Sequence, residues 1–411
     1  MNRSSRQLWE APWGYSESFL FSVGLMGIGF VLEFLTGTSP GQMVFPVNAI
    51  AGGVFIVAVL LLHFLFGQTT WLKWLSGIPA SVSAIVTLTF LVLLMGITPQ
   101  VASQEEGWMA MLGLNRMTST WPFLLISLYL LLILGLVTVR RLFFFRLKNW
   151  GFVCSHLGLW IAIWAGGLGA GDLVRLKMNL TENKTEWRAY DDKGKLYELP
   201  LAIHLKDFRI EEFHPKLAVV ENSTGELYEK TQPSMIMIEE GMECELHDWN
   251  VEIVNFLESS GRFGNRYHQL NDFGAVPSAR IRVKDQQGME LEGWISCGSF
   301  NMQHESLKLD DQHSLVMTVP EPKRFSSEVV VFTPSGKKAE VILEVNKPFT
   351  MDGWKIYQLS YDEKMGKYSQ FSIVELVRDP WQPLVYLGIF MMIIGAIHIF
   401  WIGKRKGELS L

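Results

Sequence analysis

The chain has 411 residues, with 36 basic and 41 acidic side chains; 49% of its residues are hydrophobic and only 19% are charged. Soluble domains carry about 25% charged residues, so a single water-soluble domain is excluded, as are disordered and collagen-like chains. The charge is also uneven, because residues 171–379 hold 35 of the acidic and 25 of the basic side chains, a net of −10, whereas the rest carries +5. An acidic polar module therefore lies within a hydrophobic, mildly basic frame. No strongly basic region indicates nucleic acid as a partner.

Six apolar stretches are long enough to cross the roughly 30 Å hydrocarbon core of a lipid bilayer, which takes about 17–25 helical residues. We expect membrane helices at residues 18–35, 45–66, 75–97, 121–139, 150–168 and 381–402. The first lacks an evident small-x-small cleavage site and five further spans follow it, so we interpret it as a membrane helix rather than a signal peptide.

Loop charge predicts the orientation of these helices. If both termini are cytoplasmic, the inner segments 1–17, 67–74, 140–149 and 403–411 hold ten Lys and Arg residues, and the short outer loops hold Arg116 alone. This distribution follows the positive-inside rule. We therefore expect a multi-pass membrane protein with both termini cytoplasmic and the acidic module outside.

The acidic module reads mostly as strands. Residues 279–284 and 340–345 alternate apolar and polar side chains, and residues 329–332, 354–359 and 370–377 are rich in β-branched and aromatic types. We predict a polytopic α-helical membrane protein with a large β-rich extracytoplasmic domain, a sandwich or barrel, inserted before the last helix. We expect three regions: residues 1–169 with five membrane helices, residues 170–379 as the β-rich domain, and residues 380–411 with the last helix and a basic cytoplasmic tail.

Three histidines fall within the expected spans: His63, His156 and His398. Each lies four to six residues from the inner end of its span, which predicts a depth of roughly 5–10 Å. Ionisable groups in a bilayer are costly and usually face a cavity, a partner or a ligand, and neutral imidazole is a common axial ligand of haem iron. The alternative for each is an interfacial side chain bonded to water or to a backbone carbonyl.

Other polar and small residues in the membrane region have two interpretations each. The glycines after His156 suit ordinary helix packing or the approach of a flat ligand, and Cys154 suits a small buried residue. Glu33 suits a snorkelling carboxylate near the outer surface or a cation or proton site. The four cations before the His156 helix suit either the orientation of the helices in the membrane or the binding of haem propionates. The residues concerned are Gly166, Gly167, Gly169, Gly171, Arg140, Arg141, Arg146 and Lys148.

The outer module offers fewer candidates. Its histidines show no metal-ligand spacing and are expected at the surface: His204, His214, His247, His268, His304 and His313. Cys244 and Cys297 form an even pair in a compartment where disulfides persist, so a disulfide and two free thiols both remain open. The sequence contains no Walker A, C-x-x-C-H, C-x-x-C, G-x-S-x-G or H-E-x-x-H motif, which argues against ATP-driven export, covalent haem, thioredoxin-like reduction and hydrolysis.

The end of the module carries a distinctive set of residues. The chain reads Asn346-Lys-Pro348, Gly353-Trp354, Tyr357-Gln-Leu-Ser-Tyr361-Asp362 and Arg378-Asp-Pro-Trp381, and an earlier span carries His156-Leu-Gly158. Together these blocks, which lie between residues 150 and 401, resemble the ResB (CcsB-type) family of cytochrome c biogenesis proteins. The family's usual form has four spans, and this chain has two extra hydrophobic helices before the His156-Leu-Gly158 helix, an arrangement that is more similar to variants fused or linked to CcsA.

This resemblance implies a subunit of the system II holocytochrome c synthase in the bacterial cytoplasmic (inner) membrane. Such a subunit works with a CcsA-type membrane protein to transport non-covalent haem b outward and present it to apocytochrome c. By resemblance, His156 is an axial ligand of the haem iron. His63, His398 or a partner's histidine supplies the opposite position, because the haem-handling motif and outer histidine pair of CcsA are missing here. The chain alone has no assigned catalytic residue.

Two other classes stay open. A non-catalytic membrane scaffold or assembly factor would use the β domain to bind a partner protein, and its histidines would only pack. A solute permease or extracytoplasmic sensor is disfavoured, because no span is visibly broken and no inner output domain follows.

Overall fold

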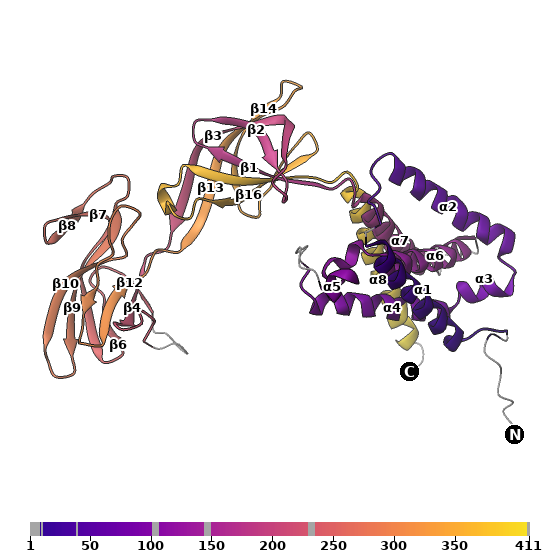
Figure 1. Ribbon diagram of the computed structural model, residues 1–411, viewed down its shortest axis with the longest axis horizontal. Helices are drawn as coiled ribbons and strands as arrows, with labels where there is room; N and C mark the ends of the chain where they lie inside the picture. Colours follow the sequence, from indigo (N-terminus) through magenta and orange to yellow (C-terminus); the bar gives the residue numbers. More distant parts are fainter. Residues whose placement is uncertain are drawn as a thin grey trace. The chain divides into compact units, whose positions relative to one another are not determined.

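A computed structural model describes residues 9, 11–37, 40–100, 107–143, 149–228 and 235–408, the last seven of these by backbone alone. The chain divides into two units, Met1–Leu173 with Asp379–Leu411, and Val174–Arg378. The first is helical and the second is built from strands (Figure 1). This confirms the predicted fold class, a helical membrane region with a β-rich domain inserted before the last helix.

Six helical segments of the first unit are long and apolar enough to cross a membrane, so the chain is a membrane protein with a soluble domain. Short helices, which the sequence analysis did not predict, lie in two of the connections. The helices are α1 (Tyr15–Thr36), α2 (Val47–Phe66), α3 (Thr70–Leu75), α4 (Ile78–Ile97), α5 (Trp108–Met111), η1 (Leu114–Ser119), α6 (Trp121–Phe143), α7 (Trp150–Gly169) and α8 (Gln382–Glu408).

Seventeen strands are described in the second unit. They are β1 (Val174–Thr181), β2 (Thr185–Tyr190), β3 (Leu196–Glu212), β4 (Lys216–Glu221), β5 (Ile236–Met237), β6 (Glu243–Leu246), β7 (Trp249–Phe263), β8 (Arg266–Gln269), β9 (Val276–Asp285), β10 (Glu290–Ser296), β11 (Leu307–Lys308), β12 (His313–Met317), β13 (Pro322–Phe332), β14 (Lys338–Glu344), β15 (Phe349–Met351), β16 (Trp354–Tyr361) and β17 (Phe371–Arg378), with the 3-10 turn η3 (Gly366–Tyr368) before the last.

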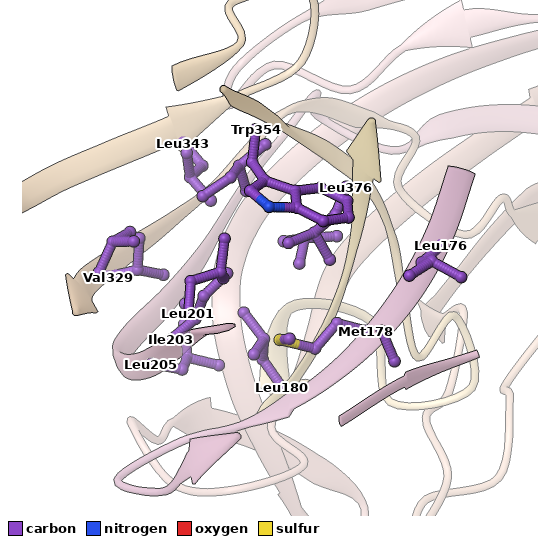
Figure 2. Close-up of a cluster of buried hydrophobic side chains, with 14 of the residues drawn as sticks. Leu176, Met178, Leu180, Leu201, Ile203, Leu205, Val329, Leu343, Trp354 and Leu376 are labelled. Atoms are coloured by element: carbon purple, nitrogen blue, oxygen red, sulfur yellow. The ribbon is translucent and has the colours of Figure 1, made fainter. Parts of the chain in front are cut away.

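The largest sheet has eight strands in the order β14-β13-β3-β2-β1-β17-β16-β15. Its strand β14 also contacts β16, so the sheet curls back on itself into a barrel-like form. Alternate side chains point inward because successive residues of a strand face opposite sides, and β1 buries Leu176, Met178 and Leu180 in this way. Figure 2 shows these residues converging with Trp354 and Leu376 on one apolar core.

Two smaller sheets form the rest of the β-rich unit. One has the order β10-β9-β7-β6 with β8 paired to β7, and the other has the order β11-β12-β4-β5. Their inner faces share a second apolar core that includes Leu217, Ile253, Ile281 and Leu315. The chain passes from the barrel-like sheet into this part after β3 and returns before β13.

The first and last strands of the β-rich unit pair with each other over their whole length. In this antiparallel pair Val174 lies opposite Arg378 and Thr181 lies opposite Phe371. The unit therefore begins and ends at neighbouring points, and the chain continues from there into α7 on one side and α8 on the other.

Candidate functional site

Helices α7 and α8 pack closely through small residues. An added Cβ at Gly158 would lie 2.5 Å from the carbonyl oxygen of Gly388, and one at Gly395 would lie 2.6 Å from that of Gly151. The thiol of Cys154 donates to the carbonyl of Met391 at 3.3 Å in the same contact. Small residues let helix backbones approach one another in a membrane, so this face of α7 is used for packing.

His156 lies on a different face of α7. Its Nδ1 is 3.0 Å from the carbonyl oxygen of Phe152, one turn earlier in the helix. Because a carbonyl only accepts, Nδ1 carries the proton of the neutral imidazole, and Nε2 of that tautomer keeps its lone pair. The imidazole stacks on the Phe152 ring at 3.7 Å, and the guanidinium of Arg141 lies 5.3 Å from the centre of that same ring.

The stripe of α7 near His156 includes open positions. At 100° per residue, Gly167 lies about 20° from His156 around the helix axis, whereas Gly151 lies about 140° away. A Cβ added at Gly166 or Gly167 would meet nothing within 4 Å, and Leu159 is 38% exposed. Within the described part of the chain, nothing donates to or accepts from Nε2 of His156. His156 is partly buried: Trp160, one turn further along, packs on α6 and α2, whereas Leu159, Gly166 and Gly167 are exposed.

His63 lies in a separate place, at the end of α2. It lines a cavity of about 600 Å³ together with Lys73 of α3 and Arg140 of α6. Its ring stacks on Phe143 with centroids 5.7 Å apart and planes at 18°. Arg140, one of the four cations considered as partners of haem propionates, therefore lines the same cavity as His63.

His398 packs against α7. Its ring lies 4.4 Å from that of Trp150, and it fills the space that a side chain at Gly151 would occupy. This contact is on the α8 face of α7, about 140° from His156. His398 is thus part of the helix contact.

The three membrane histidines therefore make three separate sets of contacts. Across residues that the structure describes, no three His, Cys, Asp or Glu side chains lie close enough to hold a metal ion. Similar depth, which the sequence indicated, does not bring them to one site. Arg146 and Lys148, expected near His156, lie outside the described residues, whereas Arg141 contacts Phe152.

Glu33 is neither a snorkelling carboxylate nor an open cation site. It is fully buried; Oε1 accepts from Arg116 at 2.9 Å, and Oε2 accepts from the backbone N–H of Trp121 at 3.0 Å. Trp121 is the first residue of α6, where a helix has N–H groups without an internal acceptor, and a carboxylate is stabilised there by the helix dipole. The alternatives drawn from the sequence were wrong here because the partners are more than 80 residues away.

Asp172 was missed by the sequence analysis. Its carboxylate accepts from the backbone N–H of Phe45 at 2.8 Å, from the side-chain amide of Asn48 at 2.7 Å and from the indole of Trp381 at 2.6 Å. These bonds lower the pKa of Asp172, with the Phe45 N–H contributing most. One carboxylate thus joins the beginnings of α2 and α8 to the end of α7. The only local signal was the conspicuous Trp381 in the Arg-Asp-Pro-Trp block.

Cys244 and Cys297 are free thiols in the structure. Cys244 lies on edge strand β6, and Cys297 directly follows β10, the opposite edge of the sheet. Three strand spacings of about 4.8 Å separate these edges by roughly 14 Å, and a disulfide requires Cα atoms within about 7 Å. Burial raises the pKa of Cys244, and it raises that of Cys297 to about 11, so both thiols are protonated at neutral pH.

Two outer histidines share a neighbour that the sequence did not indicate. The rings of His247 and His313 lie 5.0 and 4.5 Å from that of Tyr228, and Nδ1 of His313 is 2.9 Å from an Asp310 carboxylate oxygen. His313 thus has a carboxylate partner.

Part of the conspicuous C-terminal block is structural. Gln358 of Tyr357-Gln-Leu-Ser-Tyr361 lies inside the barrel-like sheet and is 5% exposed. The hydroxyl of Ser327 donates to its Oε1 at 2.6 Å, and its amide donates to the hydroxyl of Ser372 at 3.0 Å. Buried polar groups need such partners, so this network fixes how β13, β16 and β17 meet.

The fold and these contacts define a class: a polytopic helical membrane protein whose β-rich domain is inserted before the last helix. Residues 283–375, from the end of β9 into β17, match the model of the ResB-like family. This match covers about a quarter of the chain and supports its membership of the ResB-like family, a family that is associated with cytochrome c biogenesis. No curated protein matches the chain.

Proposed function

We propose that this protein is the ResB-type subunit of a system II cytochrome c biogenesis complex, which moves haem b across the bacterial cytoplasmic membrane and presents it to apocytochrome c. The observation that carries the proposal is the imidazole of His156. Its Nδ1 proton is held by the Phe152 carbonyl at 3.0 Å, which leaves the Nε2 lone pair unused. Metal-ligating histidines are oriented by a bond of this kind from the other ring nitrogen.

The surroundings of His156 suit haem as cargo. Haem is flat, apolar over most of its area and anionic at its propionates. Apolar Leu159 and the open sites at Gly166 and Gly167 extend from His156 along α7, and Arg141 beside Phe152 provides positive charge near the ring. A neutral imidazole ligates haem iron through the nitrogen that is free here.

The second axial ligand would come from a CcsA-type partner. His63 and His398 contact other residues than His156 does, so this chain offers one histidine beside the open positions of this stripe of α7. A partner helix seated on that stripe would enclose the haem and supply the opposite nitrogen. With the termini cytoplasmic, as loop charge predicts, His156 would receive haem near the inner leaflet.

The β-rich domain would then act outside the membrane as the platform for apocytochrome c. Its sequence carries a net of −10 over residues 171–379. Such a charge attracts basic protein surfaces over distances up to the Debye length, about 8 Å at physiological salt. The thioether bonds would form in the complex, because this chain contributes no identified catalytic residue.

Absorption spectra of the purified full chain, alone and with a CcsA-type partner, test this proposal. We expect a b-type Soret band that is lost in His156→Gly and partly restored by added imidazole. His63→Ala and His398→Ala are the matched controls and should keep the band. A colourless complex, or a band indifferent to His156→Gly, would instead support the alternative of a non-catalytic scaffold whose outer domain binds a partner protein.

A further inference from the structure

A cavity of about 600 Å³ lies between the end of α2, the short helix α3 and the end of α6. It has no part in the proposed haem site, because His156 and Phe152 are not among its lining residues. The residues that line it are His63, Phe64, Leu65, Gly67, Gln68, Leu72, Lys73, Ser76, Leu136, Arg140 and Phe143.

Two cations without ion-pair partners among the described residues line this cavity. Lys73 and Arg140 both line it, and none of the described lining residues is acidic. In the segments that the structure describes, neither cation forms an ion pair or a hydrogen bond. Gln68, Ser76 and the imidazole of His63 add further polar groups. Two cations that face one space without a counter-charge favour an anionic ligand.

Apolar side chains that also line the cavity are exposed. Phe64, Leu65 and Phe143 are 62, 68 and 57% exposed. These residues belong to helices long and apolar enough to span a bilayer, so their exposed faces are suited to acyl chains. The ligand that matches both the cations and the apolar side chains is an amphiphile with a negatively charged head.

The position of the cavity agrees with this chemistry. It lies at the bundle end that includes the α2–α3 connection and the end of α6, which loop charge predicts to be cytoplasmic. Anionic phospholipids occupy that surface, and basic pockets between membrane helices bind their headgroups. Lys73 and Arg140 would lie at headgroup level, near the ends of their helices.

We propose that this cavity binds the phosphate headgroup of an anionic phospholipid, with Lys73 and Arg140 on the phosphate and the acyl chains along Phe64, Leu65 and Phe143. His63 lies beside the headgroup, where a ring N–H can donate to a phosphate oxygen. A lipid bound there contacts α2, α3 and α6 together.

Native mass spectrometry of the purified full chain tests the site, with dioleoyl phosphatidylglycerol and dioleoyl phosphatidylcholine as probes. We expect preferential retention of phosphatidylglycerol. Lys73→Gln and Arg140→Gln should each weaken its binding about fivefold, and the double variant about 30-fold. Each cation near an anionic membrane surface contributes about 1 kcal/mol, which corresponds to about a fivefold change in affinity. Arg141→Gln removes the same charge from the neighbouring residue outside the cavity and should leave the preference intact.

Three results would overturn the proposal. Equal retention of the two lipids, or an equal loss in Arg141→Gln, would show only general attraction to the surface. Displacement of phosphatidylglycerol by millimolar inorganic phosphate would assign the cations to a free anion. A haem spectrum lost in His63→Ala would assign the cavity to haem. Failure of the His156 spectral test leaves the lipid measurement unaffected, so the two proposals fail separately.

Discussion

At the scale of single residues, the direction of a side chain carries more information than its position along the sequence. His63, His156 and His398 are equivalent by depth, yet only His156 combines a fixed Nδ1 proton with open positions on its helix. The sequence could indicate all three as candidates because ionisable residues in apolar spans are conspicuous. It could not separate them, because the face of a helix that is covered depends on its packing partners, and for α7 these include α8, which begins more than 200 residues later in the chain.

The thiol of Cys297 provides a residue-scale prediction. Burial raises its pKa to about 11, so at pH 8 it holds about 100-fold less reactive thiolate than an ordinary cysteine of pKa 9. We expect alkylation by iodoacetamide to be slower by about that factor and to accelerate tenfold per pH unit up to pH 11. Peptide mass spectrometry of the full chain measures the rate.

A Ser223→Cys variant gives the exposed reference thiol for this measurement, since Ser223 lies in an exposed turn. Equal rates at positions 223 and 297 at pH 8 would contradict the buried environment of Cys297. A peptide that links Cys244 to Cys297 in the non-reduced protein would contradict the strand order that places them at opposite edges of one sheet.

At the scale of elements, helices and strands were predictable from hydrophobic runs and alternation, whereas their contacts were not. The expected strands at 279–284 and 340–345 overlap β9 and β14, because their alternation reflects one buried face. The pairing of Glu33 on α1 with Arg116 and with the first N–H of α6 left no local signal. The apolar length of α1 predicted a membrane helix correctly, but only the three-dimensional contact explains why a carboxylate is tolerated in it.

The contact between α7 and α8 gives the element-scale prediction. A methyl group at Gly158 would meet the backbone oxygen of Gly388 at 2.5 Å and the backbone nitrogen of Met392 at 2.8 Å, and backbone atoms cannot rotate away. Gly158→Ala should therefore lower the stability of the membrane unit by about 1–3 kcal/mol. The midpoint of thermal unfolding of the full chain in detergent measures this loss.

Gly166 on the same helix is the matched control. An added methyl group there meets nothing within 4 Å, and alanine is favoured over glycine in a helix interior by about 1 kcal/mol. Gly166→Ala should thus leave the midpoint unchanged or raise it. A loss as large as that of Gly158→Ala would mean that glycine content alone, rather than the contact with α8, determines the stability of α7.

At the scale of the whole molecule, two folding units share one chain, and the division follows composition. The charged residues concentrate between residues 171 and 379, and the β-rich unit spans Val174–Arg378. The order of its eight-stranded sheet was beyond sequence reasoning, since β1 pairs with β17 almost 200 residues later. Pairing over such distances is decided by which apolar faces fill a common core, and many strand orders satisfy the same alternation.

This closure of the β-rich unit predicts that it folds without the membrane helices. Its first and last strands pair from Val174↔Arg378 to Thr181↔Phe371, so the unit starts and ends within its own sheet, and its two apolar cores draw only on its own strands. A fragment of residues 174–378 should be soluble, with a strand-rich circular dichroism spectrum, a cooperative thermal transition and amide protons of β1, β3 and β17 protected from exchange.

A fragment of residues 182–370 lacks only β1 and β17, which bury Leu176, Met178, Leu180, Val374 and Leu376, and it should fail to fold. Equal protection in both fragments would mean that the closing strand pair is dispensable, and aggregation of the longer fragment would mean that the helices are needed to complete the domain.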